Sequence, residues 1–275
     1  MNQAICFKIL QRQLKFRNPN DVLTIPHDFQ FSYKEYQAAL DYFDRLHQYG
    51  IQFTYPGDEK YPQQFRTMKE PPLFLEFIGK PFWLDYPCLS IVGTRQMHPL
   101  TESWMHEHLV SYFNLERVCV VSGGAFGVDQ AAHFISVKQG VPTIVVVPSG
   151  LVKIYPKAMK DQLDLLGPEW VCYMSEFEIH QPLNKHHFFA RNRLIAAFGE
   201  IVFVAQAEVK SGSFLTVHHA LENGRPVVTL PAHPSMLGFS GNIRLLQEGA
   251  FLVTSSLDLR EIWRAEKQAN QLTLI

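Results

Sequence analysis

The stretch VCVVSGGAFGVDQAAH, residues 118–133, is the part of the chain that decides its fold class. A β-branched apolar run ends at Ser122, two adjacent glycines follow, and an amphipathic helix is predicted to begin near Gly127. A strand–glycine–helix junction of this kind leaves unpaired backbone N–H groups at the positive end of a helix. Glycine is needed where a side chain would block a phosphate or forbid a positive φ. The junction therefore predicts an anion site at a helix start, with a tight turn that binds nothing as the alternative.

Outward from this junction, short apolar runs alternate with helical patterns from residue 89 onward. Strands are predicted at 89–92, 118–121, 143–147, 171–174, 201–205, 227–230 and 251–253, and helices at 99–113, 127–139, 157–166, 190–198, 213–223, 241–248 and 256–267. Strands that are apolar on both faces and alternate with helices indicate an α/β fold, with a mostly parallel sheet covered by helices on both faces. Ligands of such sheets bind beyond the carboxyl ends of the strands, so a site is expected in the segments that follow them.

The N-terminal part of the chain follows a different pattern. Residues 1–55 predict a small helical N-terminal module, whose last helix ends at Gly50 as a C-cap. A connector rich in proline and aromatic residues comes next and ends in a strand around 73–78. The predicted organisation is therefore a helical module at 1–55, an α/β domain at 56–268 and a tail at 269–275.

Composition excludes several classes of protein. The chain is 47% hydrophobic and 19% charged, with 25 Lys plus Arg against 26 Asp plus Glu, so a nucleic-acid site would have to be a local cationic patch. No apolar run approaches the roughly 20 residues that span a bilayer, and no signal-peptide cleavage site is evident, so we expect no membrane association and a cytoplasmic protein. The histidines include two adjacent pairs whose side chains point apart, so no metal site is expected. The cysteines are scattered and are interpreted as buried small side chains in a reducing compartment: Cys6, Cys88, Cys119 and Cys172.

Hydrogen-bond donors and cations follow the predicted strands. Arg95 comes after the first strand of the alternating region, and its planar guanidinium suits a phosphate, although a surface ion pair is the alternative. The further candidates along the chain are Ser122, Gly123, Gly124, Lys153, Lys157, Lys185, Arg191, Arg193, Lys210, Ser211, Gly212 and Ser213. For the lysines the alternative is a solvated surface. Two glycine–serine turns at one sheet edge would form a broad anion-binding floor, which favours a polynucleotide over a mononucleotide.

The pair Phe188–Phe189 lies among the basic residues of this region. Basic side chains interleaved with aromatic ones suit a single strand, because the charges contact its backbone and the rings stack on its bases. One of the two phenylalanines is nevertheless expected in the core. Asp129, in the first turn of its helix, is expected to cap that helix, and His133 to be structural.

Motifs that would indicate catalysis are missing from the sequence. There is no GxxxxGK[ST] loop, no GxGxxG followed by an acid about 20 residues later, and no acid cluster suited to magnesium after the strands. No Ser-His-Asp set is evident from spacing. We therefore expect a binding protein and not an enzyme, without catalytic residues and without a cofactor.

Taken together, six blocks resemble the DNA-processing protein A family (DprA, also called Smf): SIVGTR, SGGAFGVDQAAH, YPK, FFARNRLIA, KSGSFLTVHHALENGRPV and GFSGNIRLLQEGA. They occur in the family's order over roughly residues 50–260. The resemblance implies an extended Rossmann-like domain that binds single-stranded DNA, forms a homodimer, protects incoming DNA and helps load the RecA recombinase during natural transformation. It implies phosphate contacts by Arg95 and Lys157, and a pocket formed by Ser122, Gly123, Gly124, Arg191, Asn192, Arg193, Lys210, Ser211, Gly212 and Ser213.

The chain departs from the family pattern at three positions. Phe126 stands where basic or small residues are common, Met159 where an asparagine often follows YPK, and Lys153 where some members have an aromatic for base stacking. Two other functions stay open from the sequence. One is a nucleotide-processing enzyme related to the lysine-decarboxylase-like phosphoribohydrolases, with Glu222 as a candidate base, although the PGGxGTxxE block of that group is missing. The other is a nucleotide sensor.

Overall fold

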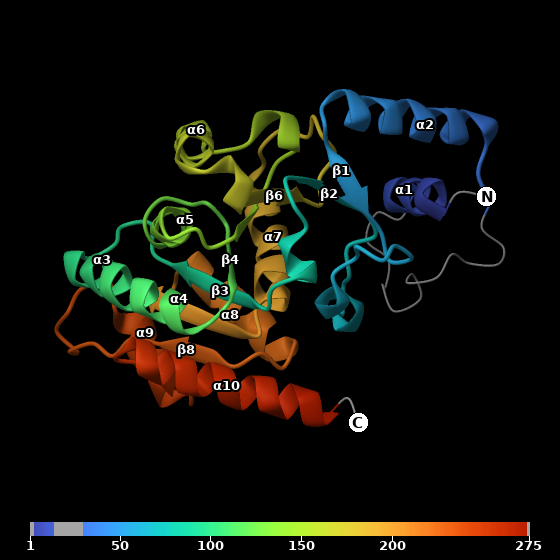
Figure 1. Cartoon of the computed structure of the whole chain (residues 1–275). Coiled ribbons are helices and arrows are strands. Elements are labelled where there is room, and N and C mark those ends of the chain that lie inside the picture. The colour runs from blue at the N-terminus through green and yellow to red at the C-terminus, as the bar shows by residue number, and fades with distance from the viewer. Residues whose placement is uncertain (1–2, 14–29, 274–275) are drawn as a thin grey trace.

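The computed structural model describes residues 3–13 and 30–273, with side chains up to residue 268. Within these residues a single sheet has the strand order β1-β2-β6-β5-β4-β3-β7-β8-β9 (Figure 1). The pairs β1–β2 and β2–β6 are antiparallel and the others are parallel. The strands are β1 (Gln52–Thr54), β2 (Leu75–Ile78), β3 (Cys88–Gly93), β4 (Cys119–Ser122), β5 (Thr143–Val146), β6 (Val171–Ser175), β7 (Ile201–Gln206), β8 (Val227–Thr229) and β9 (Phe251–Leu252).

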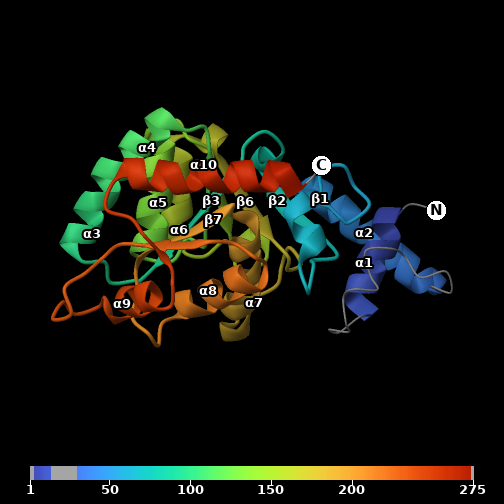
Figure 2. The same cartoon turned by 90° about the horizontal axis from the view of Figure 1, so that it is seen from below.

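Helices cover both faces of this sheet (Figure 2). Alternate residues of the central strands enter different buried clusters, one on each face of the sheet. This agrees with the predicted strands, which are apolar on both faces. One layer contains α7 (Lys185–Phe198), α8 (Gly212–Glu222) and α9 (Ser240–Gln247). The opposite layer contains α3 (Pro99–Trp104), α4 (Val110–Leu115), α5 (Val128–Lys138), α6 (Lys157–Leu166) and α10 (Ser256–Thr273). This arrangement confirms the predicted fold class, a mostly parallel, Rossmann-like sheet.

The strand order places a topological switch at the centre of the sheet. From β3 the chain proceeds through β4, β5 and β6 towards one edge, and it then returns through α7 to β7 on the other side of β3. The helices that follow β3 and β7 therefore lie on opposite faces, which opens a crevice beyond the carboxyl ends of these neighbouring strands. This crevice is where the segments predicted to carry the site converge.

The helices α1 (Gln3–Gln13) and α2 (Tyr33–Gln48) lie side by side beyond the β1 edge (Figure 1). Lys8 of α1 is fully buried, with its ammonium 4.0 Å from the centre of the Tyr42 ring and 3.6 Å from a Glu76 carboxylate oxygen. Burial raises the pKa of Glu76 to about 7, although the nearby ammonium opposes this shift. Residues 52–54, which the sequence analysis assigned to the helical module, form strand β1 of the main sheet. Residues 14–29 of that module lie outside the described residues.

Several local expectations can be compared with the structure. The C-cap of α2 is Tyr49, and the predicted Gly50 follows it with φ 63°, the left-handed conformation in which glycine commonly ends a helix. The helix predicted over 99–113 is interrupted by a π-helical turn, Met105–Leu109, and α10 extends to Thr273, into the predicted tail. The four cysteines are free and buried, in agreement with their interpretation as small core side chains. None of the helices in the described part of the chain is long and apolar enough to cross a bilayer.

Candidate functional site

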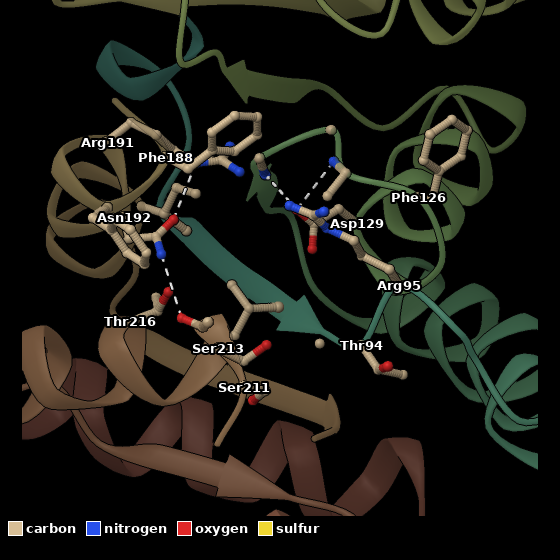
Figure 3. A pocket seen from close by; sticks show the side chains of 18 of the residues that line it. Thr94, Arg95, Phe126, Asp129, Phe188, Arg191, Asn192, Ser211, Ser213 and Thr216 are labelled. Carbon is tan, nitrogen blue, oxygen red and sulfur yellow. Dashed lines mark hydrogen bonds between the residues drawn. The ribbon is translucent and has the colours of Figure 1, made fainter. Parts of the chain in front are cut away.

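An open pocket of about 830 Å³ lies at the carboxyl edge of the sheet (Figure 3). Its lining comes from segments that follow five strands. These are residues 92–96 at the end of β3 and just after it, Gly123 to Phe126 with Asp129 after β4, Tyr155 and Pro156 after β5, residues between 183 and 195 after β6, and residues between 211 and 216 after β7. The pocket thus occupies the crevice at the switch in strand order, where this fold class binds its ligands.

The β4–α5 junction is built around Asp129. Its carboxylate accepts hydrogen bonds from the backbone N–H groups of Gly123 (3.2 Å) and Ala125 (3.3 Å). Asp129 lies in the first turn of α5, as expected, but it bonds the turn before the helix and makes no side-chain cap of the helix itself. Burial raises the pKa of Asp129, while the neighbouring Arg191 opposes that change. The sequence predicts an anion site at this glycine turn. These two N–H groups already bond a carboxylate of the chain, however, and are not free for an external anion.

The buried cation of the pocket is Arg191 of α7, whose residue surface is only 4% exposed. Its guanidinium donates to the carbonyl oxygen of Val146 (2.6 Å) and to Oδ1 of Asn192 (3.0 Å). Burial lowers the pKa of Arg191 to about 10, so the group stays charged at neutral pH. The guanidinium lies directly against Gly123, where an added Cβ would come within 1.8 Å of Nη1. Glycine at this position is therefore needed for the approach of the arginine.

Arg95 supplies a second cation from the end of β3, and its side chain is exposed. Its guanidinium carbon lies 5.6 Å from the centre of the Phe188 ring, on the wall formed by α7 (Figure 3). Phe188 is half-buried and Phe189 is 43% exposed, and both line the pocket. The expectation that one of them lies in the core is wrong, because α7 begins at Lys185 and not near residue 190.

The N-terminus of α8 forms the third wall. Ser211, Gly212 and Ser213 line the pocket, and Asn192 Nδ2 donates to the Gly212 carbonyl (3.4 Å) across the α7–α8 contact. A Cβ built on Gly212 would meet nothing within 4 Å, so this backbone is open on the pocket side. The Ser211 hydroxyl has no hydrogen-bond partner among the described residues although its oxygen is buried. An open helix start with a free hydroxyl can receive an anion.

Lys185, at the start of α7, is exposed and lines the pocket, whereas the remaining predicted site residues lie outside the lining. Ser122 is fully buried and its hydroxyl donates to the Ile91 carbonyl (2.6 Å), which commits it to the core. Arg193 is 9% exposed and forms an ion pair with Glu176, so its guanidinium is already neutralised. Three lysines are exposed outside the lining: Lys153, Lys157 and Lys210. Lys157 forms an exposed ion pair with Asp161, which is the alternative considered for it.

Sequence reasoning missed Tyr155 as a lining residue and treated Phe126 only as a departure from the family pattern. Both are aromatic residues next to turn residues in the sequence, and that signal could have found them. Their exposed fractions are 44% for Tyr155 and 53% for Phe126. The block GFSGNIRLLQEGA contributes Asn242, which fixes the end of β7 and the residue after β8. Its Oδ1 accepts the N–H of Ala207, and its Nδ2 donates to the carbonyls of Ala205 and Leu230. His133 is fully buried against Thr143, as expected of a structural residue.

Two further candidates from the sequence can be placed. Glu222 lies at the end of α8 and pairs with His219 (3.1 Å), and it is not part of the pocket lining. Among the described residues, no group of three or more His, Cys, Asp or Glu side chains is placed to hold a metal ion.

The fold and the pocket define a class: a doubly wound α/β protein whose crevice at the switch in strand order gathers arginines, aromatic rings and a helix N-terminus. The family model described as DNA recombination-mediator protein A matches residues 52–264, and the chain belongs to that family. The resemblance seen in the sequence blocks is thereby confirmed.

Individual relatives agree with this assignment. The DNA processing protein DprA of Streptococcus pneumoniae is 37% identical over 204 residues, which cover 74% of this chain and 71% of that protein. An X-ray structure of DprA from Streptococcus pneumoniae has a TM-score of 0.73 at 29% identity and covers 94% of this chain and 93% of that one. A DprA structure from Helicobacter pylori, described with a single-stranded DNA binding mode, has a TM-score of 0.67 at 28% identity and covers 78% and 97%. The chain spans only 56% of another relative, Protein Smf of Synechocystis, with 29% identity over 80% of this chain.

Proposed function

We propose that this chain binds single-stranded DNA in the pocket and acts as a recombination mediator without catalysing a reaction. The observation that carries the proposal is the convergence of Arg95, Arg191 and the α8 N-terminus in one open crevice bordered by aromatic rings. Guanidinium groups and helix N-termini bind phosphate, and exposed rings accept unpaired bases. The Helicobacter pylori relative, described as binding single-stranded DNA, supports this choice of ligand.

Turnover is disfavoured by the chemistry of the lining. Asp129 is the one carboxylate among the described lining residues, and it already accepts two backbone N–H groups beside Arg191. A carboxylate held in this way stabilises the loop and is poorly placed to accept a proton from a substrate. The position of Glu222 outside the pocket likewise gives no support to the phosphoribohydrolase alternative.

The proposed DNA contacts are a subset of the residues expected from the sequence. Arg95, Arg191 and Asn192 would contact phosphates together with Ser211, Gly212 and Ser213. Gly123 and Gly124 shape the floor, and the exposed lysines Lys153, Lys157 and Lys210 would add a long-range attraction around it. Ser122 is left out because its hydroxyl is bonded to the Ile91 carbonyl, and Arg193 because its guanidinium pairs with Glu176 outside the pocket lining.

The wider role rests on family membership. We propose that the protein works in the cytoplasm as a homodimer, protects incoming DNA and helps load the RecA recombinase during natural transformation. RecA strand exchange on single-stranded DNA covered by a single-strand-binding protein tests the loading step, and light scattering after size exclusion tests the dimer. No stimulation, or a monomer at micromolar concentration, would remove the corresponding part of the proposal.

The binding proposal is tested by fluorescence anisotropy with a labelled oligothymidylate and a hairpin duplex over a series of salt concentrations. We expect tighter binding of the single strand, and a salt slope that falls by about 0.7 for Arg95→Ala, the value for one lost phosphate contact on a single strand. Arg264→Ala is the matched control, because Arg264 is an exposed arginine on α10, outside the pocket.

The outcomes separate the candidate functions. Equal affinity for both DNA forms, or an unchanged slope in Arg95→Ala, contradicts the proposal. Tight binding of nucleoside monophosphates without preference for an oligomer supports a nucleotide sensor, and release of free base from them supports the phosphoribohydrolase.

A further inference from the structure

Phe126 places a half-exposed aromatic ring in the lining of the pocket. The residue is 53% exposed and belongs to the pocket lining. Figure 3 shows it on the α5 side, away from Phe188 on the α7 side, with Arg95 between the two. A single exposed phenylalanine on a protein surface is ordinary, so its surroundings have to decide whether it binds anything.

The backbone that carries the ring is held firmly. Gly124 and Gly127 have φ values of 72° and 77°, a region that favours glycine, and the N–H of Ala125 is bonded to Asp129. A Cβ on Gly127 would come within 2.4 Å of the Thr94 carbonyl oxygen, so this turn is packed against the end of β3. The exposure of the ring is therefore a property of a fixed loop.

Across the pocket the order of groups is ring, cation, ring. Arg95 contacts the face of Phe188, and the Phe126 ring borders the opposite wall. A single strand presents the same alternation, because each phosphate lies between two nucleosides whose bases are free to turn outward. A phosphate held at Arg95 would thus direct one neighbouring base towards α7 and the other towards the β4–α5 turn.

We propose that Phe126 is a stacking platform for an unpaired base and a residue that makes the pocket prefer single-stranded over duplex DNA. This inference rests on the proposed function of the pocket. In a duplex the faces of a base are covered by its neighbours, and reaching the ring would require unstacking it. A single strand offers these faces without that penalty.

The kind of side chain at position 126 also sets how binding depends on salt. A basic residue there would contribute a charge contact that salt weakens, whereas a ring contributes a contact that salt hardly affects. With phenylalanine at position 126, this position therefore contributes stacking and no charge contact. Replacing the ring by a cation should reverse this.

The test compares variants at position 126 with a control at Tyr33, an exposed aromatic (78%) at the start of α2 and outside the pocket. For Phe126→Ala we expect single-strand affinity to fall by roughly 5- to 150-fold, the range for one lost stacked base, with the salt slope and the duplex affinity unchanged. Phe126→Trp should retain affinity, and Phe126→Lys should raise the salt slope by about 0.7. Tyr33→Ala should behave as the unmodified protein.

Oligonucleotides with a single abasic site give an independent readout. The unmodified protein should lose affinity when the abasic site is at one particular position, and Phe126→Ala should be insensitive to the same change. If the unmodified protein shows no preference for single strands, the proposed function fails. If it shows that preference and Phe126→Ala keeps both affinity and abasic sensitivity, the function stands and the inference about Phe126 is wrong.

Discussion

Replacing Gly123 by alanine tests the contact on which the pocket floor depends. The new Cβ would lie 1.8 Å from Nη1 and 2.1 Å from Cζ of Arg191, so the guanidinium would have to move. The movement breaks its 2.6 Å hydrogen bond to the Val146 carbonyl and separates it from the buried Asp129. Loss of a hydrogen bond to a charged group costs about 1.5–3 kcal/mol, and an uncompensated buried charge costs about 3–5 kcal/mol.

Because the chain can relax in part, we expect Gly123→Ala to lower the free energy of unfolding by about 2–5 kcal/mol. That is a large share of the roughly 5–15 kcal/mol that stabilises a typical protein. Urea denaturation followed by tryptophan fluorescence and circular dichroism measures the change. Where the variant remains folded, its single-strand affinity should also fall, since Arg191 would no longer occupy the pocket floor.

Gly212→Ala is the matched control, because its Cβ would meet nothing within 4 Å. Its stability should stay equal or rise by up to about 1 kcal/mol, as for alanine at an unstrained helical position. Its affinity for single-stranded DNA should fall nevertheless, because the methyl group would occupy the open approach to the α8 N-terminus. A Gly123→Ala protein within about 0.5 kcal/mol of the original would show that Arg191 does not pack against Gly123.

Three other expectations concern buried polar groups. Burial lowers the pKa of His133 to about 3, below its unfolded value near 6.5, so its contribution to stability is complete above pH 6.5 and is lost as the pH falls towards 3. In denaturation curves between pH 6.5 and 4, His133→Gln should remove a pH dependence of the unfolding free energy of up to about 1.4 kcal/mol per pH unit. An unchanged pH dependence would contradict this. Arg193→Met should lower the free energy of unfolding by about 3 kcal/mol, because it leaves Glu176 unpaired, and the double variant with Glu176→Gln should recover part of that loss. DNA affinity should stay constant in both variants. A drop in affinity would indicate that Arg193 contacts DNA. Ser122→Ala should cost about 1 kcal/mol in urea denaturation with unchanged DNA binding, whereas normal stability with weakened binding would favour a direct DNA contact.

Much of the fold could be read from the alternation of apolar runs, because buried parallel strands need side chains that are apolar on both faces. The strand predicted at 201–205 is β7 (Ile201–Gln206), and the helix predicted over 213–223 is α8 (Gly212–Glu222). The β6–α7 connection was the least accurate part. The polar run from Lys185 onward predicts a loop, but Asn184 caps a helix there and accepts the N–H of His186 (3.0 Å).

Site residues were predictable where the backbone position decides the role, and less so where the direction of a side chain decides it. Arg191 and Arg193 are two residues apart on α7, a rotation of about 200° on a helix. The first therefore reaches the pocket floor while the second turns to Glu176. The two arginines share the same stretch of sequence, ARNR, so their neighbours along the chain do not distinguish them. Only the packing of α7 on the sheet does.

The sequence alone was enough to indicate the class of fold, the edge of the sheet where the pocket lies and the family to which the chain belongs. These follow from local patterns: hydrophobic periodicity, glycine turns and the order of the sequence blocks along one chain. Tertiary structure decided which donors are free, because hydrogen bonds between distant segments are invisible in a sequence. Asp129 takes up N–H groups of the glycine turn, and the cation that packs against this turn is Arg191, more than 60 residues further along the chain.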